Sequence, residues 1–170
     1  MKKRLLKTSS YFILAIVLGL TAAYALRSER AVGQGDSPSG KLQGTWRADV
    51  TLTNCAGTPI RTFQSLITFV PPGTPGVAAG SVLEVSNSTF FRSAGQGIWR
   101  YESGRTFSTN FRHFLFDSSG VAIRTNDVTK TIVLGASDNE YTATTAFEMR
   151  DLSGNLVQAG CATDVGRRVE

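Results

Sequence analysis

The chain has 170 residues, of which 41% are hydrophobic and 18% charged, a composition that suits one globular domain with a sizeable core. Its formal net charge of +5 includes four basic residues within the first seven positions, and the rest of the chain carries 14 Lys and Arg against 13 Asp and Glu. Apart from that terminus the chain is nearly neutral, which argues against a nucleic-acid-binding protein or a partner of anionic membranes.

Residues 1–25 have the pattern of a secretory signal peptide. Residues 1–7 are basic, residues 11–20 are an apolar run, and residues 23–25 match the A-x-A cleavage pattern. An uncleaved anchor is the alternative, but the apolar run is short against the roughly 20 residues that a spanning helix needs. We expect cleavage after Ala25. The basic start and short apolar run are typical of bacteria, so the mature protein should be secreted or periplasmic, without membrane contact after cleavage.

Residues 26–40 are rich in Gly, Ser and charge and predict a flexible leader. From residue 41 to residue 170, short alternating apolar and polar runs are separated by turn residues at regular spacing. This pattern is typical of an all-β sandwich or barrel. We expect eight strands, at about residues 44–54, 60–70, 81–91, 96–103, 106–117, 121–135, 140–150 and 155–168.

Most links between the expected strands are short and contain Gly, Ser, Asp or Asn, so sequence neighbours should pair as antiparallel hairpins. The exceptions are the Pro- and Gly-rich segment 71–80 and the Gly-rich segment 93–97. Eight such strands can stay open with two bare edges or close into a barrel, and closure removes the exposed edges. The sequence therefore predicts an all-β, eight-stranded antiparallel up-and-down barrel whose first and last strands pair.

The two cysteines support this closure. In an exported protein an even number of cysteines suggests a disulfide, and two buried thiols are the alternative. Along an antiparallel pair of strands, the residue numbers of any two facing residues add up to the same total. The sums for Cys55 with Cys161 and for Trp46 with Arg168 differ by two, which is one same-face step. One pairing of the first and last strands therefore accommodates both contacts.

The ends of the expected barrel carry a further pattern, Gly44-Thr45-Trp46 in the first strand and Arg167 with Arg168 in the last. This resembles the calycins, that is, the lipocalins and their relatives, including small secreted bacterial proteins. In lipocalins a Gly-x-Trp motif opens the first strand, and a basic residue from the end of the barrel packs across the Trp ring. The resemblance implies this contact here, and strand parity favours Arg168 over Arg167. An eight-stranded barrel has an interior that is either filled with side chains or just wide enough for one small ligand.

The sequence shows no catalytic motif. His113 is the only histidine, and we interpret it as a hydrogen-bonded packing residue rather than a haem or metal ligand. There is no His-x-His, Cys-x-x-Cys or Gly-x-Ser-x-Gly pattern, so no cofactor and no metal site are predicted. Asp127, Asp138 and Asp151 lie in or near turns, where carboxylates cap backbone N–H groups, and we interpret them as turn residues before calcium ligands.

Several expected strands place aromatic side chains and a few hydroxyls on one face, the mixture found in small-molecule pockets. A filled core is the alternative interpretation of the same faces. The candidate cavity residues are Trp99, Tyr101, Phe111, His113, Tyr141 and Phe147.

Three functions fit this barrel. The first is an exported lipocalin-like carrier that binds a small apolar molecule in its interior, and this is our leading hypothesis. The second is a structural or envelope-interaction protein with a filled barrel. The third is a barrel cyclase or isomerase, in which side chains such as Glu84, Glu102, Arg124 or Tyr141 steer a reactive substrate.

Overall fold

The computed structural model describes residues 38–74, 77–88 and 91–169. The predicted signal peptide, its cleavage after Ala25 and most of the predicted leader lie outside these residues, so they remain predictions. Within the described part of the chain, no helix is long and apolar enough to cross a membrane.

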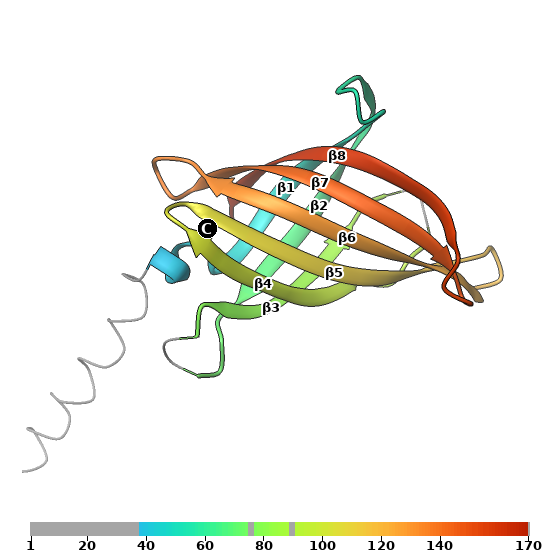
Figure 1. Ribbon diagram of the computed structural model, residues 1–170, viewed down its shortest axis with the longest axis horizontal. Helices are drawn as coiled ribbons and strands as arrows, with labels where there is room; N and C mark the ends of the chain where they lie inside the picture. Colours follow the sequence, from blue (N-terminus) through green and yellow to red (C-terminus); the bar gives the residue numbers. More distant parts are fainter. Residues whose placement is uncertain (1–37, 75–76, 89–90, 170) are drawn as a thin grey trace, which may run out of the picture. The chain divides into compact units, whose positions relative to one another are not determined.

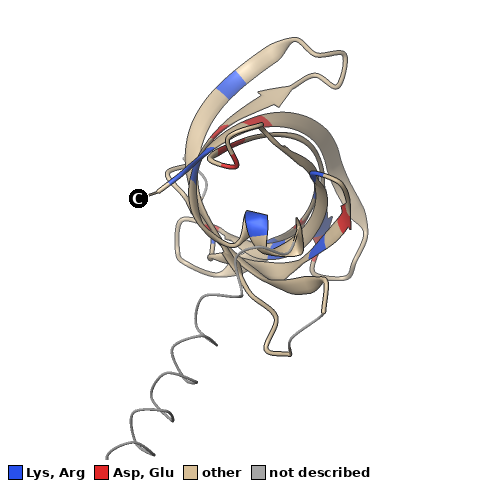
Figure 2. Cartoon of the chain, turned by 90° about the vertical axis from the view of Figure 1, so that its left-hand side faces the viewer, with Lys and Arg blue, Asp and Glu red and all other residues tan. Residues whose placement is uncertain are grey.

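Eight antiparallel strands in sequence order form one closed barrel, in which β1 pairs with β8 (Figures 1 and 2). This confirms the predicted fold, and a short 3₁₀ turn, η1, precedes the first strand. The elements are η1 Pro38–Leu42, β1 Gly44–Thr53, β2 Pro59–Val70, β3 Ala79–Ser86, β4 Gly95–Ser103, β5 Thr106–Phe116, β6 Ala122–Leu134, β7 Glu140–Asp151 and β8 Leu156–Arg168.

The strand limits agree with the prediction to within two residues, except at the end of β3. That strand was expected to reach residue 91 and ends at Ser86. Side chains take over the hydrogen bonding at this point: Asn87 Oδ1 accepts from the Gln64 amide at 2.8 Å, and Ser86 Oγ accepts from the Ser88 amide at 3.2 Å. The bond between residues 86 and 88 is local and the bond to Gln64 reaches across to β2; both replace bonds of a regular ladder, so the strand ends there.

The seam between β1 and β8 has the register that the sequence predicts. Trp46 lies opposite Arg168, and Thr53 lies opposite Cys161. A disulfide joins Cys55 to Cys161, with the two Cα atoms 5.0 Å apart, inside the range that this bond requires. Trp46 is buried, whereas Cys55 is exposed, so the ring lies inside the barrel and the disulfide lies on its outer side.

The η1 end of the barrel is closed by its own side chains. Leu42 is fully buried, and its carbonyl accepts a hydrogen bond from Trp46 Nε1 at 2.8 Å. The Arg168 guanidinium lies 4.3 Å from the centroid of the Trp46 ring and donates to the carbonyls of Gln43 and Lys41 at 2.5 and 2.6 Å. The last strand thereby holds the turn that covers this end.

Aromatic rings fill the half of the barrel next to η1, and two glycines make room for them. A Cβ at Gly166 would lie 2.1 Å from the Tyr141 ring, and one at Gly80 would lie 2.6 Å from Trp99 Nε1. Such distances leave space for no larger residue. Trp99 also packs against Phe107, with ring centroids 6.1 Å apart. This half is therefore a packed core.

Candidate ligand-binding site

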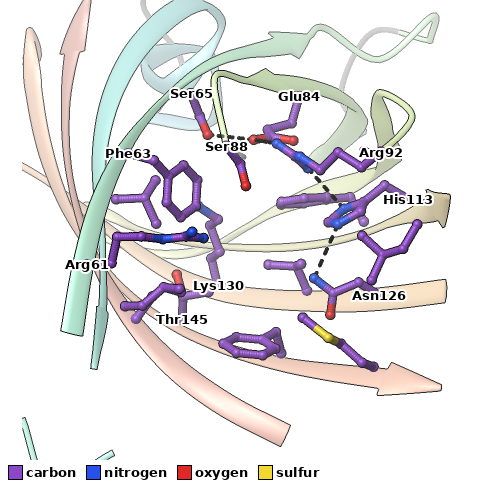
Figure 3. A pocket seen from close by; sticks show the side chains of 18 residues that line it. Arg61, Phe63, Ser65, Glu84, Ser88, Arg92, His113, Asn126, Lys130 and Thr145 are labelled. Atoms are coloured by element: carbon purple, nitrogen blue, oxygen red, sulfur yellow. Dashed lines mark hydrogen bonds and ion pairs between the residues drawn. The ribbon is translucent and has the colours of Figure 1, made fainter. Parts of the chain in front are cut away.

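A cavity of about 80 Å³ lies in the other half of the barrel, toward the hairpins β1–β2, β3–β4, β5–β6 and β7–β8 (Figure 3). Leu52, Phe63 and Phe147 line it and are only half-buried although they pack against the core. Solvent therefore reaches the cavity from this end, which we call the mouth. The volume is enough for several water molecules or a small organic group.

One wall of the cavity is apolar. Its side chains come from β1, β7 and β8, where inward-facing positions alternate with exposed ones. Phe147 extends over Gly160, where a Cβ would lie 2.3 Å from the ring. The side chains of this wall are Val50, Leu52, Phe147, Met149 and Ala162.

The opposite wall is polar and is organised around Glu84 of β3 (Figure 3). Glu84 Oε1 accepts from Ser65 Oγ at 2.6 Å and from Arg92 Nη2 at 2.7 Å. Arg92 comes from the β3–β4 connection and also donates to Ser86 Oγ at 3.1 Å. The side chains of Glu84 and Arg92 are 4% and 9% exposed, so this is a buried ion pair with supporting hydrogen bonds.

The network keeps Glu84 ionised. Burial acts to raise the pKa of the Glu84 carboxyl, but the hydrogen bonds from Arg92 and Ser65 and the charges of Arg92 and Lys130 together lower it below its ordinary value. Arg92 is the counter-charge of this carboxylate at Oε1, whereas Glu84 Oε2 is buried with no hydrogen-bond partner among the described residues.

His113 of β5 continues this network. Its Nδ1 lies 3.2 Å from Arg92 Nη1, and its Nε2 lies 3.3 Å from Asn126 Nδ2. A guanidinium only donates, so Nδ1 accepts and the ring proton is on Nε2. A half-turn of the Asn126 amide places Oδ1 at Nε2 as its acceptor, which satisfies an oxygen that is otherwise buried without a partner.

The imidazole is neutral at neutral pH. Burial, followed by the charge of Arg92, lowers the pKa of His113 from 6.5 to about 4, although the charges of Glu84 and Asp127 act in the opposite direction. His113 is therefore a hydrogen-bonded residue of the polar wall.

A second buried ion pair crosses the barrel from β6 to β8. The Lys130 ammonium donates to Asp164, and Thr145 Oγ1 donates to the same carboxylate at 3.2 Å. The side chains of Lys130 and Asp164 are 3% and 0% exposed. Lys130 lines the cavity and lies 5.7 Å from the centroid of the Phe111 ring. Asp164 thus holds a lysine inside the barrel, where it faces the cavity.

Arg61 and Phe63 lie on β2 at the mouth, both half-buried. Figure 3 shows the side chains of Arg61 and Lys130 extending into the pocket. Among the described residues, no group of three or more His, Cys, Asp or Glu side chains could hold a metal ion.

Three of the six candidate residues line the cavity, namely Phe111, His113 and Phe147. The other three, Trp99, Tyr101 and Tyr141, are not among its lining residues. Trp99 and Tyr141 are buried in the packed half, and Tyr101 packs against Phe107 with ring centroids 5.4 Å apart. The contact of either set with a ligand remains a prediction.

Sequence reasoning did not single out Arg92, Lys130, Asn126 or Asp164. The sequence did contain a signal for Lys130. On β6 it occupies the inward-facing position between Val128 and Ile132, which are both apolar. A charged residue within an apolar stripe indicates a buried polar contact. No such signal marks Arg92, which enters the barrel from a loop.

No protein-family model matches the chain, and no curated protein matches it. Among solved structures, the chain is similar to the S-type phycobiliprotein lyase CPES from Guillardia theta, with a TM-score of 0.41 and 12% sequence identity. The match covers 78% of this chain and 90% of that one. The assignment of the fold rests on the strand pairing of the barrel itself.

Proposed function

We propose that the protein is an exported, lipocalin-like barrel that binds a small, mostly apolar molecule in the cavity at its mouth. The observation that carries this proposal is the cavity of about 80 Å³ between an apolar and a polar wall. Ligand pockets combine such apolar surfaces with a few polar groups that fix orientation. Since drug-sized ligands need about 300 Å³ or more, the ligand is small or inserts only one end.

The polar wall also weighs against a purely structural barrel. Burying charged groups costs free energy. A protein in which well-packed apolar residues replace a buried ion pair is often as stable as the original or more stable. A barrel with only a structural role has no need for both Glu84–Arg92 and Lys130–Asp164 in its interior. Their position around a cavity is better explained by a binding site.

A cyclase or isomerase is less well supported. Of the four side chains considered for that role, Glu84 alone is among the cavity-lining residues. Glu102 accepts a hydrogen bond from Ser108 on the exposed side of the sheet, and Tyr141 belongs to the packed half. Glu84 itself is held by Arg92 and Ser65, which does not suit a general base.

The proposal is tested by filling the cavity. Small apolar molecules are screened by ligand-observed NMR against the exported protein and the Ala162→Leu variant. Ala162 is buried and lines the cavity, so the larger side chain should abolish binding. Overpacking costs about 1–3 kcal/mol, and circular dichroism checks that the variant is folded.

The matched control is Ala159→Leu, which adds the same volume at an exposed position of β8 and should bind as the unmodified protein does. Equal binding by the Ala162→Leu variant would show that the ligand lies elsewhere. If no compound binds the unmodified protein, the proposed function is wrong.

A further inference from the structure

We infer that the ligand of this cavity carries a neutral hydroxyl group, which donates a hydrogen bond to Glu84 Oε2 while its hydrocarbon part faces Phe147 and Met149. This inference rests on the binding function proposed above and names the chemical class of the ligand. It follows from a buried carboxylate oxygen that the polar wall leaves without a donor, and from the two ion pairs that balance the charges around it.

Glu84 has one oxygen that the protein does not satisfy. Its side chain is 4% exposed and lines the cavity. Oε1 accepts two hydrogen bonds, whereas Oε2 is buried and has no hydrogen-bond partner among the described residues. Removing a carboxylate oxygen from water without giving it a donor costs free energy. A molecule in the cavity that supplies this donor therefore gains affinity from a group that the empty site leaves unpaired.

The donors of the polar wall are directed at other acceptors. Ser65 Oγ donates to Oε1 of Glu84. Arg92 directs Nη2 to the same oxygen, Nη1 to His113 and Nε to Ser86. Moving one of these groups to Oε2 would break a hydrogen bond that the wall already has. The missing donor is therefore expected from the ligand.

The surroundings of Oε2 favour a small donor group. A Cβ at Gly95 of β4 would lie 3.3 Å from this oxygen and 2.7 Å from Cδ2 of Phe111, which also lines the cavity. The glycine thus lets the carboxylate and the edge of the Phe111 ring lie close together. With the backbone and the ring so near, a single O–H group fits better than a larger amide.

The charges around Oε2 favour a neutral donor. Arg92 is the counter-charge of Glu84, and Asp164 is that of Lys130. An ammonium group in the ligand would add a third cation to these two balanced pairs and would lose its own hydration, and a carboxylate would face Oε2 with a like charge. A hydroxyl does neither. Its oxygen also accepts, which suits Lys130, since this ammonium has three N–H donors and one acceptor among the described residues, Asp164.

The test compares four probes with one chain length but different head groups. Hexan-1-ol and 1-methoxypentane are isomers, of which only the alcohol can donate a hydrogen bond, and hexanoate and hexylammonium add a charge of either sign. Their affinities for the exported protein are measured by NMR titration at one fixed ionic strength, since salt screens charge interactions. We expect hexan-1-ol to bind at least tenfold more tightly than 1-methoxypentane, which corresponds to about 1.4 kcal/mol, and more tightly than either ion.

The Glu84→Gln variant identifies the acceptor. Its amide keeps one oxygen for Arg92 and places an NH₂ group, which donates and does not accept, where Oε2 was. The alcohol and the ether can both accept from this group, so they should bind the variant with equal affinity. Hexan-1-ol should bind it at least fivefold more weakly than it binds the unmodified protein. Circular dichroism checks the fold, because Arg92 loses its counter-charge.

The matched control is Glu102→Gln, which makes the same change at an exposed position of β4 and should leave the preference for the alcohol intact. The comparison of probes on the unmodified protein does not depend on either variant folding.

The outcomes separate this inference from the proposed function. Equal affinities for hexan-1-ol and 1-methoxypentane would show that water alone serves Oε2, and would overturn the hydroxyl assignment while leaving a small-molecule site in place. Tightest binding of hexylammonium or hexanoate would overturn it as well, as would a Glu84→Gln variant that folds and still prefers the alcohol. If neither the screen nor the four probes show binding, both the inference and the proposed function are wrong.

Discussion

The mostly apolar interior of this barrel also contains charged residues that form ion pairs across strands. Lys130 and Asp164 illustrate the consequence: each is nearly inaccessible to solvent, and each is the counter-charge of the other. Removing one partner of such a pair typically costs about 3–5 kcal/mol, because the remaining charge stays buried. The pair therefore fixes the positions of β6 and β8 around the cavity as well as the position of the lysine.

His113 gives the polar wall a pH dependence. Its pKa is about 4 in the folded protein against 6.5 in the unfolded chain. Between these values the unfolded chain binds the proton more tightly, so stability is lost as the pH falls from about 6.5 to 4 and is unaffected above that window. Over this range, we expect the free energy of unfolding of the unmodified protein to fall by about 3 kcal/mol more than that of the His113→Gln variant. Urea unfolding at several pH values measures it.

The titration itself can be followed directly, because His113 is the only histidine of the chain and gives a single set of imidazole resonances in the ¹H NMR spectrum. A midpoint close to that of a solvent-exposed histidine would show that the ring is not buried in the Arg92 and Asn126 network.

Arg168 should contribute more to stability than its neighbour Arg167. Arg168 lies over the Trp46 ring and donates to the backbone carbonyls of Lys41 and Gln43. Arg167 is 58% exposed and has a 3.4 Å contact with Glu140. We expect Arg168→Ala to lower the free energy of unfolding by about 2 kcal/mol, and Arg167→Ala by less than about 0.5 kcal/mol. Equal losses in urea unfolding would contradict this account.

At the scale of strands, the period-2 alternation and the turn residues predict both the number of strands and their pairing. The exception is the end of β3. Residues up to 91 have strand-like composition, but the side chains of Ser86 and Asn87 cap the strand, and the chain then pairs with the end of β5 through Arg92 and Leu115. Such side-chain bonds depend on the tertiary structure and leave no periodic signal. Arg92, after the end of β3, reaches Glu84 inside the barrel.

The disulfide joins Cys55, which lies just beyond the end of β1, to Cys161 of β8. It links residues separated by 106 positions, so it restricts the unfolded chain strongly in the chain-entropy description. Replacing both Cys55 and Cys161 by Ser should lower the free energy of unfolding by about 2–5 kcal/mol. Urea unfolding of the two proteins without reductant measures the difference, and the measurement is repeated with a reductant added to each. If the reductant leaves the unmodified protein unchanged, the disulfide is not responsible for the difference.

For the whole barrel, the sequence predicts the closed topology well because many weak signals agree: alternation, hairpin turns and the sums at the seam. It predicts less of the site. The inward faces of β5 and β7 carry Phe111, His113 and Phe147 into the cavity, but alternation alone does not show which half of the barrel is filled. That depends on Gly80 and Gly166, which let Trp99 and Tyr141 pack across the η1 half.

Export and the disulfide belong together as a prediction about the whole protein. Disulfides persist in oxidising compartments and are rare in reducing ones, so the bond between Cys55 and Cys161 is consistent with the signal pattern in residues 1–25. We expect the chain, produced from its own start codon in a bacterial host, to accumulate in the periplasm or medium without residues 1–25 and with both thiols blocked. Intact-mass measurement before and after reduction and alkylation tests both points. A protein that still contains residues 1–7 would refute cleavage, and thiols that react before reduction would refute the link between export and bond formation.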